Sequence, residues 1–265
     1  MNRLTDLDVQ NQGIANLTGL EFATNLSFLQ LKSNRIEDIS PPGNLTQLTD
    51  LHLGGNRIED ISPLGNLTQL TDLHLGGNRI EDISPLANLT QLTVLRLNEN
   101  GRIEDISSLA NLTQLKVADL DRNEIVDVSP IARLTNLESL DLRGNRIIDA
   151  SPLANLMQLN ELRLSENQII DINPLANLTN LAALWLSDNQ ITDVTALAHL
   201  TQLTQLLLSN NRIEDVSPLE NLTNLEQLDT HNNPIFDPDS PLVEVPDPNL
   251  RAAVREALNL SLIHI

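Results

Sequence analysis

Apolar residues recur along the chain at one fixed spacing. In the stretch Leu48–Asn56 they form the pattern Leu-x-x-Leu-x-Leu-x-x-Asn, and its final asparagine returns every 22 residues, with one extra residue at Gly101. The copies end at Asn34, Asn56, Asn78, Asn100, Asn123, Asn145, Asn167, Asn189, Asn211 and Asn233. A period of this length indicates one small structural unit that stacks on copies of itself.

Each unit predicts one strand followed by a turn. Leu51 and Leu53 alternate with polar residues, which is the pattern of a half-buried strand. Asn56 falls where the chain leaves the strand, so its amide is expected to bond to loop backbone, and successive asparagines should form a ladder. The pattern is that of leucine-rich repeats, and we predict an α/β solenoid of about eleven repeats over residues 1–233. It should be a curved right-handed coil with a parallel sheet on its concave face.

The return path of each unit predicts a short helical turn on the convex side. Ser62 and Pro63 suggest a helix cap followed by proline at the first helical position. Aspartate precedes this turn in nine units, and each carboxylate is expected to accept hydrogen bonds from turn backbone, although binding of cations is an alternative. These residues are Asp38, Asp60, Asp82, Asp105, Asp127, Asp149, Asp171, Asp193 and Asp215.

Composition narrows the classes of partner. Aromatic residues are 2% of the 265 residues, so the core must be aliphatic. The net charge of −20 argues against nucleic acid and against an anionic membrane surface. The chain has no cysteine and no apolar stretch long enough to span a bilayer, so we expect neither cysteine chemistry nor membrane insertion. We expect a monomer without a cofactor.

The stretch Asn78–Leu92, with its Asp-Ile-Ser-Pro-Leu core, resembles the internalin-type leucine-rich repeats of bacteria. The resemblance extends from Leu4 to Asn233. It implies a bacterial solenoid that binds proteins with the concave side of its sheet and that is often displayed at the cell surface or secreted.

The chain departs from that family at both ends. No cap precedes the first repeat, so we expect the natural protein to begin earlier. Residues 234–248, rich in proline and aspartate, are interpreted as a linker. Residues 249–259 form an amphipathic pattern similar to the helix that caps the start of such arrays, and residues 260–265 resemble a translated sequencing adapter.

Stacking should align the outward residues of the strands into columns. The central column is Asp8, Gln30, His52, His74, Arg96, Asp119, Asp141, Arg163, Trp185, Leu207 and Asp229. From it we predict a partner-binding surface made of Arg96, Asp119, Asp141, Arg163, Trp185 and Leu207. An outward tryptophan beside arginine is typical of an interface anchor, although it also fits a surface residue without a partner.

Asp119, Asp121 and Asp141 are expected to cluster in the middle of this face, and the cluster has three interpretations. The carboxylates can bind calcium, recognise a charged partner, or form a solvated face with neighbouring cations. Three ion pairs are expected from the register: Lys116 with Glu138, Asp121 with Arg143, and Asp141 with Arg163.

His52 and His74, with Asp50 and Asp72 beside them, have a spacing that suits a metal site. However, they belong to two units, residues 43–64 and 65–86, that are identical in all 22 positions. Duplication would place these residues together in any case, so the sequence alone assigns no metal site.

The sequence carries no recognisable catalytic motif. We therefore predict a non-enzymatic module that binds a protein, or alternatively a glycan, on the face of the sheet. A second hypothesis treats the array as the sensory or targeting arm of a larger enzyme, whose catalytic domain would lie outside these residues. A third treats it as a spacer.

Overall fold

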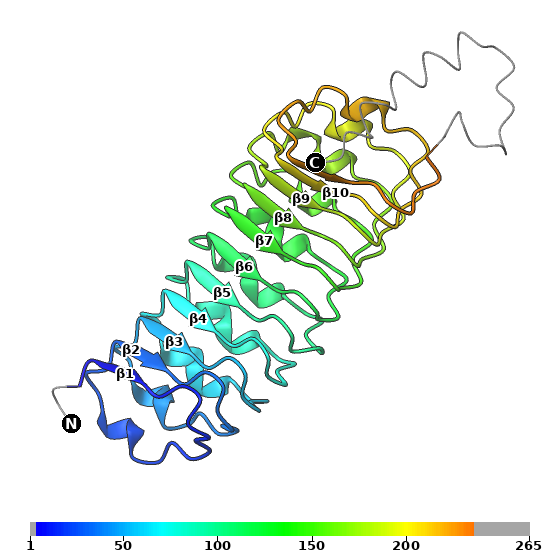
Figure 1. Ribbon diagram of the computed structural model, residues 1–265. Helices are drawn as coiled ribbons and strands as arrows, with labels where there is room; N and C mark the ends of the chain where they lie inside the picture. The colour runs from blue at the N-terminus through cyan, green and yellow to red at the C-terminus, as the bar shows by residue number, and fades with distance from the viewer. Residues whose placement is uncertain (1–3, 236–265) are drawn as a thin grey trace, which may run out of the picture.

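Eleven parallel strands lie side by side in one open sheet, in the order of the chain (Figure 1). The computed structural model describes residues 4–235. Its strands are β1 (Asp6–Asp8), β2 (Phe28–Gln30), β3 (Asp50–His52), β4 (Asp72–His74), β5 (Val94–Arg96), β6 (Val117–Asp119), β7 (Ser139–Asp141), β8 (Glu161–Arg163), β9 (Ala183–Trp185), β10 (Gln205–Leu207) and β11 (Gln227–Asp229). This arrangement confirms the predicted leucine-rich repeat solenoid.

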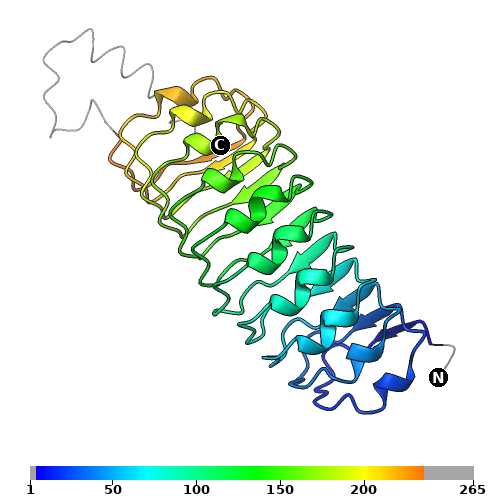
Figure 2. The same ribbon diagram turned by 180° about the vertical axis from the view of Figure 1, so that it is seen from behind.

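Short 3-10 helices line the side opposite the sheet, as Figure 2 shows. They are η1 (Leu20–Phe22), η2 (Pro42–Asn44), η3 (Ser62–Asn66), η4 (Ser84–Asn88), η5 (Ser107–Asn111), η6 (Ser129–Arg133), η7 (Ser151–Leu153), η8 (Asn173–Asn177), η9 (Thr195–Leu197) and η10 (Ser217–Leu219). None of the helices among residues 4–235 has the length and apolar character that a bilayer crossing requires. Most of the predicted linker, together with the helix at 249–259 and the tail at 260–265, lies outside the described residues.

The register of the sheet follows the repeat length. His52 pairs with His74, so equivalent positions of neighbouring units stand next to each other. Across β5 and β6 the offset grows by one residue, and Arg96 still pairs with Asp119. The extra residue is Gly101, which has a φ of +74° and would meet nothing within 4 Å if it carried a Cβ. The loop therefore absorbs the insertion without disturbing the columns.

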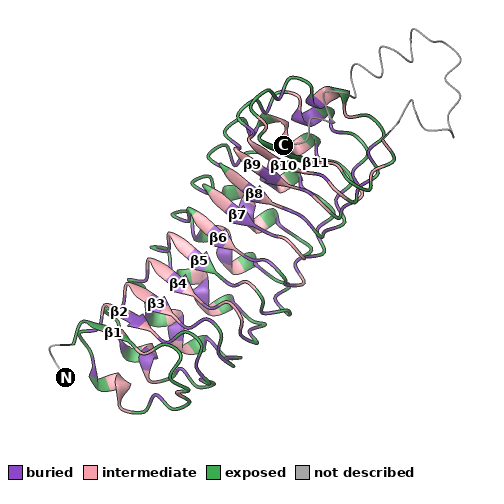
Figure 3. Ribbon diagram, viewed as in Figure 1, coloured by how far each residue is buried: buried purple, intermediate pink, exposed green. Residues whose placement is uncertain are grey.

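The core is a stack of aliphatic layers between sheet and helices. In one unit Leu51 from the strand and Ile58, Ile61 and Leu64 from the return path are 0–1% exposed. In β2 to β6 and β8 to β10 such a buried residue stands between two residues that are partly or fully exposed (Figure 3). Burying one such side chain stabilises the fold by roughly 1.5–3 kcal/mol, and every unit repeats the same set.

The buried asparagines form the predicted ladder. Asn145 donates hydrogen bonds from Nδ2 to the carbonyl oxygens of Leu120 (3.1 Å) and Leu142 (2.9 Å). Its Oδ1 accepts a hydrogen bond of 3.0 Å from the backbone N–H of Ile125. One side chain thus satisfies backbone groups in two consecutive units, which ties the units together as well as closing the turn.

The convex aspartates make the predicted turn contacts. In all nine units the carboxylate accepts a hydrogen bond of 2.7–2.8 Å from the backbone N–H two residues later. Hydrogen bonds from the backbone and hydroxyl of Ser62 hold the pKa of Asp60 below its usual value. The role predicted for Ser62 is wrong: Ile61 is the helix cap, and the Ser62 hydroxyl donates to Asp60 instead. The Asp60 carboxylate therefore takes the hydroxyl group that was expected to cap the helix.

Candidate functional site

The outward side of the sheet is the surface on which the repeats differ from one another. The register places the predicted central column in one unbroken line from Asp8 to Asp229. The line brings the six predicted binding residues together on β5 to β10: Arg96, Asp119, Asp141, Arg163, Trp185 and Leu207. Each is held by a strand whose inward neighbours are buried in the core, so the backbone that carries it is fixed.

An open groove of about 820 Å³ runs along this face from Gln10 to Arg163. The outward positions after His52 and His74 are Gly54 and Gly76, which carry no side chain, and the Asn98 side chain lies against Gly76. A groove of this kind along a row of strands is suited to an elongated or convex ligand rather than to a small molecule that must be enclosed.

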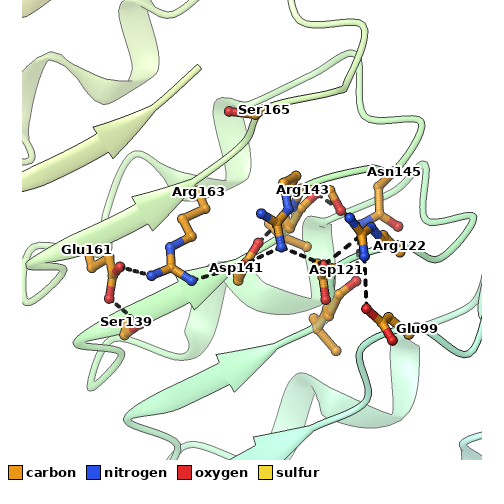
Figure 4. Close-up of polar contacts among 12 residues, drawn as sticks. Glu99, Asp121, Arg122, Ser139, Asp141, Arg143, Asn145, Glu161, Arg163 and Ser165 are labelled. Atoms are coloured by element: carbon orange, nitrogen blue, oxygen red, sulfur yellow. Dashed lines mark hydrogen bonds and ion pairs between the residues drawn. The ribbon is translucent and has the colours of Figure 1, made fainter. Parts of the chain in front are cut away.

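A chain of ion pairs crosses the middle of the face (Figure 4). Asp121 and Asp141 are only 3% and 6% exposed. Arg143 Nη2 lies 2.8 Å from Asp121 Oδ2, and Arg163 Nη1 lies 3.1 Å from Asp141 Oδ2. Both pairs were predicted from the register, and the predicted pair of Lys116 with Glu138 forms at 2.9 Å. Because guanidinium groups already compensate the buried carboxylates, the geometry favours ion pairing over calcium.

Three further residues of this network could not be predicted from the repeat pattern. Glu161, in the neighbouring column, also contacts Arg163. Arg122 pairs with Glu99 at 2.8 Å from turn positions where both residues have positive φ. The repeat places these turns in sequence, but it does not specify where their long side chains point.

Asp119 has an unusual environment among the described carboxylates. Its Oδ1 is buried and has no hydrogen-bond partner within residues 4–235. Burial raises the pKa of Asp119, and the negative charges of Asp121 and Asp141 raise it further, to about 6. The neighbouring Arg96 opposes this rise. The groove therefore contains a carboxyl group with an unused oxygen beside an exposed guanidinium.

Trp185 stands between Arg163 and Leu207 on the neighbouring strands, as predicted. The guanidinium carbon of Arg163 lies 4.2 Å from the centroid of the Trp185 ring, which is a cation–π contact. The indole Nε1 is buried and has no hydrogen-bond partner in the described part of the chain. Arg163 thus holds the ring in place on one side while the indole N–H remains unused.

A second cluster lies on β3 and β4. The rings of His52 and His74 are stacked, with centroids 4.0 Å apart and planes within 3°. Asp72 Oδ1 lies 2.8 Å from His74 Nε2 and 3.4 Å from His52 Nε2. Burial raises the pKa of Asp72, but the two histidines lower it by more, to well below its usual range. Asp50 stands apart from this cluster, and its carboxylate accepts a hydrogen bond of 2.6 Å from the Thr49 hydroxyl.

The sequence matches the family model described as Leucine Rich repeats (2 copies). The matches cover residues 24–66, 68–111, 113–155, 158–199 and 201–243, which is most of the chain. A comparison with curated protein sequences found no match.

Several solved structures have the same architecture. An internalin (inlF) from Listeria monocytogenes is 45% identical, with a TM-score of 0.88 over 89% of this chain and 69% of that one. Internalin C2 from the same organism is 34% identical, with a TM-score of 0.53 over 85% and 80% of the two chains. The Arabidopsis receptor kinase HAESA, solved in complex with the peptide hormone IDA and the co-receptor SERK1, is 26% identical, with a TM-score of 0.71 over 86% and 40%.

Proposed function

Because the chain belongs to the internalin-type leucine-rich repeat proteins, we propose that it is a non-enzymatic module that binds a protein on the outward face of its sheet. The binding surface is centred on β5 to β10 and consists of Arg96, Asp119, Asp141, Arg163, Trp185 and Leu207. Repeat proteins use such extended surfaces to bind other molecules, and the order of the different side chains along the column determines which partner binds.

The observation that carries this proposal is the state of Trp185. A tryptophan at an outward position contributes little to the core, yet its ring is ordered against Arg163 at 4.2 Å. Its indole N–H is buried without a partner in the described residues. Interface anchors are frequently tryptophan and arginine, held in place before the partner arrives.

The charges on the same face as Trp185 favour a protein over a glycan. Asp119 and Arg96 lie next to each other in the column and have opposite charges when both are ionised. The unused oxygen of Asp119 suits a hydrogen-bond donor on the ligand. A partner with a complementary alternation of charged and apolar groups fits this row, whereas a neutral glycan would use Trp185 and leave the charges without partners. The similar fold of HAESA, solved with a peptide hormone, is a precedent for a polypeptide ligand.

The experiment compares two aromatic substitutions. We expect Trp185→Ala to weaken binding at least about tenfold, since truncated anchors typically lose 2 kcal/mol or more. Phe22→Ala is the matched control, because Phe22 is 64% exposed and lies on η1, opposite the sheet. Partners captured from surface proteins of candidate host cells are identified by mass spectrometry, and their affinities for the three chains are measured by surface plasmon resonance.

Equal loss of affinity in both variants, or no loss in either, would show that the partner does not bind at Trp185. Arg163→Glu is a poorer test of binding. It would set a third carboxylate between Asp141 and Glu161, so that any loss of affinity could come from the loss of stability.

A further inference from the structure

A separate site lies on β3 and β4, away from Trp185. We propose that His52, Asp72 and His74 together bind one divalent transition-metal ion, for which Zn²⁺ is the reference. The ligand atoms are the Nε2 atoms of the two histidines and Oδ1 of the aspartate. This inference does not depend on the protein-binding function proposed above.

The spacing of the three atoms fits a metal. Asp72 Oδ1 lies 2.8 Å and 3.4 Å from the two Nε2 atoms, and all three atoms lie within 4.8 Å of one another. Bonds of about 2.0–2.1 Å in a tetrahedral zinc site put ligand atoms about 3.4 Å apart. Small side-chain movements are therefore enough to bring the three atoms to bonding distance around one ion.

The same three atoms have no hydrogen-bond partner outside their own cluster among residues 4–235. Nε2 of His52, Nε2 of His74 and Oδ1 of Asp72 are all buried, and their close polar contacts are with one another. Buried polar atoms are nearly always satisfied in folded proteins, and leaving one unsatisfied is costly. A single cation at their centre satisfies all three at once.

The surroundings allow the imidazoles to turn toward an ion. Parallel rings aim their Nε2 lone pairs in the same direction, so each ring must rotate about χ2 when it coordinates. The next outward positions are Gly54 and Gly76, which carry no side chain of their own, and the side-chain amide of Asn98 lies against Gly76. On the far side of His52, the side-chain amide of Gln30 lies 3.2 Å from Nδ1. If the oxygen and nitrogen of this amide are exchanged, its oxygen accepts a hydrogen bond from Nδ1–H of His52. Metal-bound histidines usually donate such a hydrogen bond from the ring nitrogen that does not bind the metal.

The ligand set selects the class of metal. Imidazole nitrogen suits Zn²⁺ and its neighbours in the first transition row, whereas Ca²⁺ and Mg²⁺ prefer oxygen ligands. Three protein ligands leave a fourth position of a tetrahedral site open. Both histidines line the groove, from which water or a carboxylate or imidazole of a bound protein would complete the site.

The two identical units create this cluster at one place among the described repeats. His52 and His74 are equivalent residues, and Asp72 contacts both. Asp50 is the equivalent of Asp72 in the preceding unit, but its carboxylate is engaged by Thr49. Asp50→Asn is therefore a matched control for Asp72→Asn: the same substitution, in the same repeat position, with the same change in net charge.

The experiment is a calorimetric titration of the full chain, stripped of metal with a chelator, with ZnCl₂. We expect one saturable site per chain. Asp72→Asn and His74→Gln should each weaken Zn²⁺ binding at least about tenfold, while Asp50→Asn should change it less than about twofold. Titration with Co²⁺ is expected to give the visible d–d absorption of a four-coordinate ion. The melting temperature of each metal-free variant confirms that it is folded.

The proposal is overturned by any of three results. These are the absence of saturable Zn²⁺ binding to the folded wild-type chain, unchanged binding in the folded Asp72→Asn and His74→Gln variants, and an equal loss in Asp50→Asn and Asp72→Asn. The last result would show an effect of net charge rather than of coordination.

Discussion

The interior and the outward face of this solenoid are built from the same strands but follow opposite rules. In β10, Leu206 points inward and is 0% exposed, while Leu207 next to it points into the central column. Across the described strands the equivalents of Leu206 are leucine except for Ala118 in β6, whereas the equivalents of Leu207 include acids, bases, histidines and tryptophan. Because the inward residues are nearly the same in every unit, each unit packs against the next in the same way. The outward residues differ, so a ligand can recognise one part of the face and not another.

The face itself contains a copied and a diverged part. β3 and β4 come from identical units and present the same residues twice. β6 to β9 present Asp119, Asp141, Arg163 and Trp185, which differ at nearly every step. The first part therefore suits an ion that needs like ligands from neighbouring strands, and the second suits a partner with an irregular surface.

Truncation of the two neighbouring leucines of β10 is expected to separate the interior from the outward face most clearly. We expect Leu206→Ala to lower the free energy of unfolding by about 2–5 kcal/mol, because it leaves a cavity between repeats. Leu207→Ala should cost less than about 1 kcal/mol, since it removes no core contact. Urea unfolding of both variants measures the difference. Similar losses would mean that the face is as structural as the core.

The asparagine ladder gives the next largest effect. Asn189 donates to the carbonyl oxygens of Leu164 and Leu186 and accepts from the Ile169 N–H, all at 3.0 Å. Asn189→Ala should cost about 1–3 kcal/mol for the buried groups that it leaves unpaired. Asn180→Ala is the control, because the exposed side chain of Asn180 makes one hydrogen bond within the described residues, to the Met157 carbonyl oxygen. Chemical denaturation of the two variants should separate them clearly; equal midpoints would contradict the ladder's role.

The smallest effect depends on pH. The pKa of Asp119 is raised to about 6, so the folded state holds its proton more tightly than the unfolded state does. Its contribution to stability is therefore present below about pH 4 and is lost as the pH rises through 6. Asp119→Asn should become more stable than wild type by about 1–2 kcal/mol near pH 7, after allowance for solvent screening, and should lose this advantage near pH 4.

Asp229 in the same column provides a control of opposite sign. Burial raises the pKa of Asp229, but hydrogen bonds from His231 lower it by more. Its stabilising contribution is therefore present at neutral pH and is lost as the pH falls, so Asp229→Asn should be destabilising near pH 7 and neutral in acid. Unfolding curves at several pH values test both signs, and parallel profiles for the two variants would contradict the assignment.

The repeat period alone predicted the strands, the columns, the asparagine ladder and the central ion pairs, because stacking converts an offset of about one repeat into contact. It also placed Trp185 beside Arg163. The contacts that the period did not predict depend on competition between nearby hydrogen-bond acceptors and on the direction of long side chains. The Ser62 hydroxyl bonds to Asp60 rather than capping the turn. The second partner of Arg163, Glu161, follows from the direction of a flexible side chain. Neither is specified by periodicity.

The chain contains a spectroscopic probe of whether a protein partner binds the diverged part of the face. Trp185 is the only tryptophan in the 265 residues. The chain labelled with 5-fluorotryptophan therefore gives one ¹⁹F resonance, which can be followed while the captured partner is titrated. We expect this resonance to shift or broaden and to saturate at the stoichiometry of the complex. A complex that forms while the resonance stays unchanged would place the partner elsewhere and contradict the account.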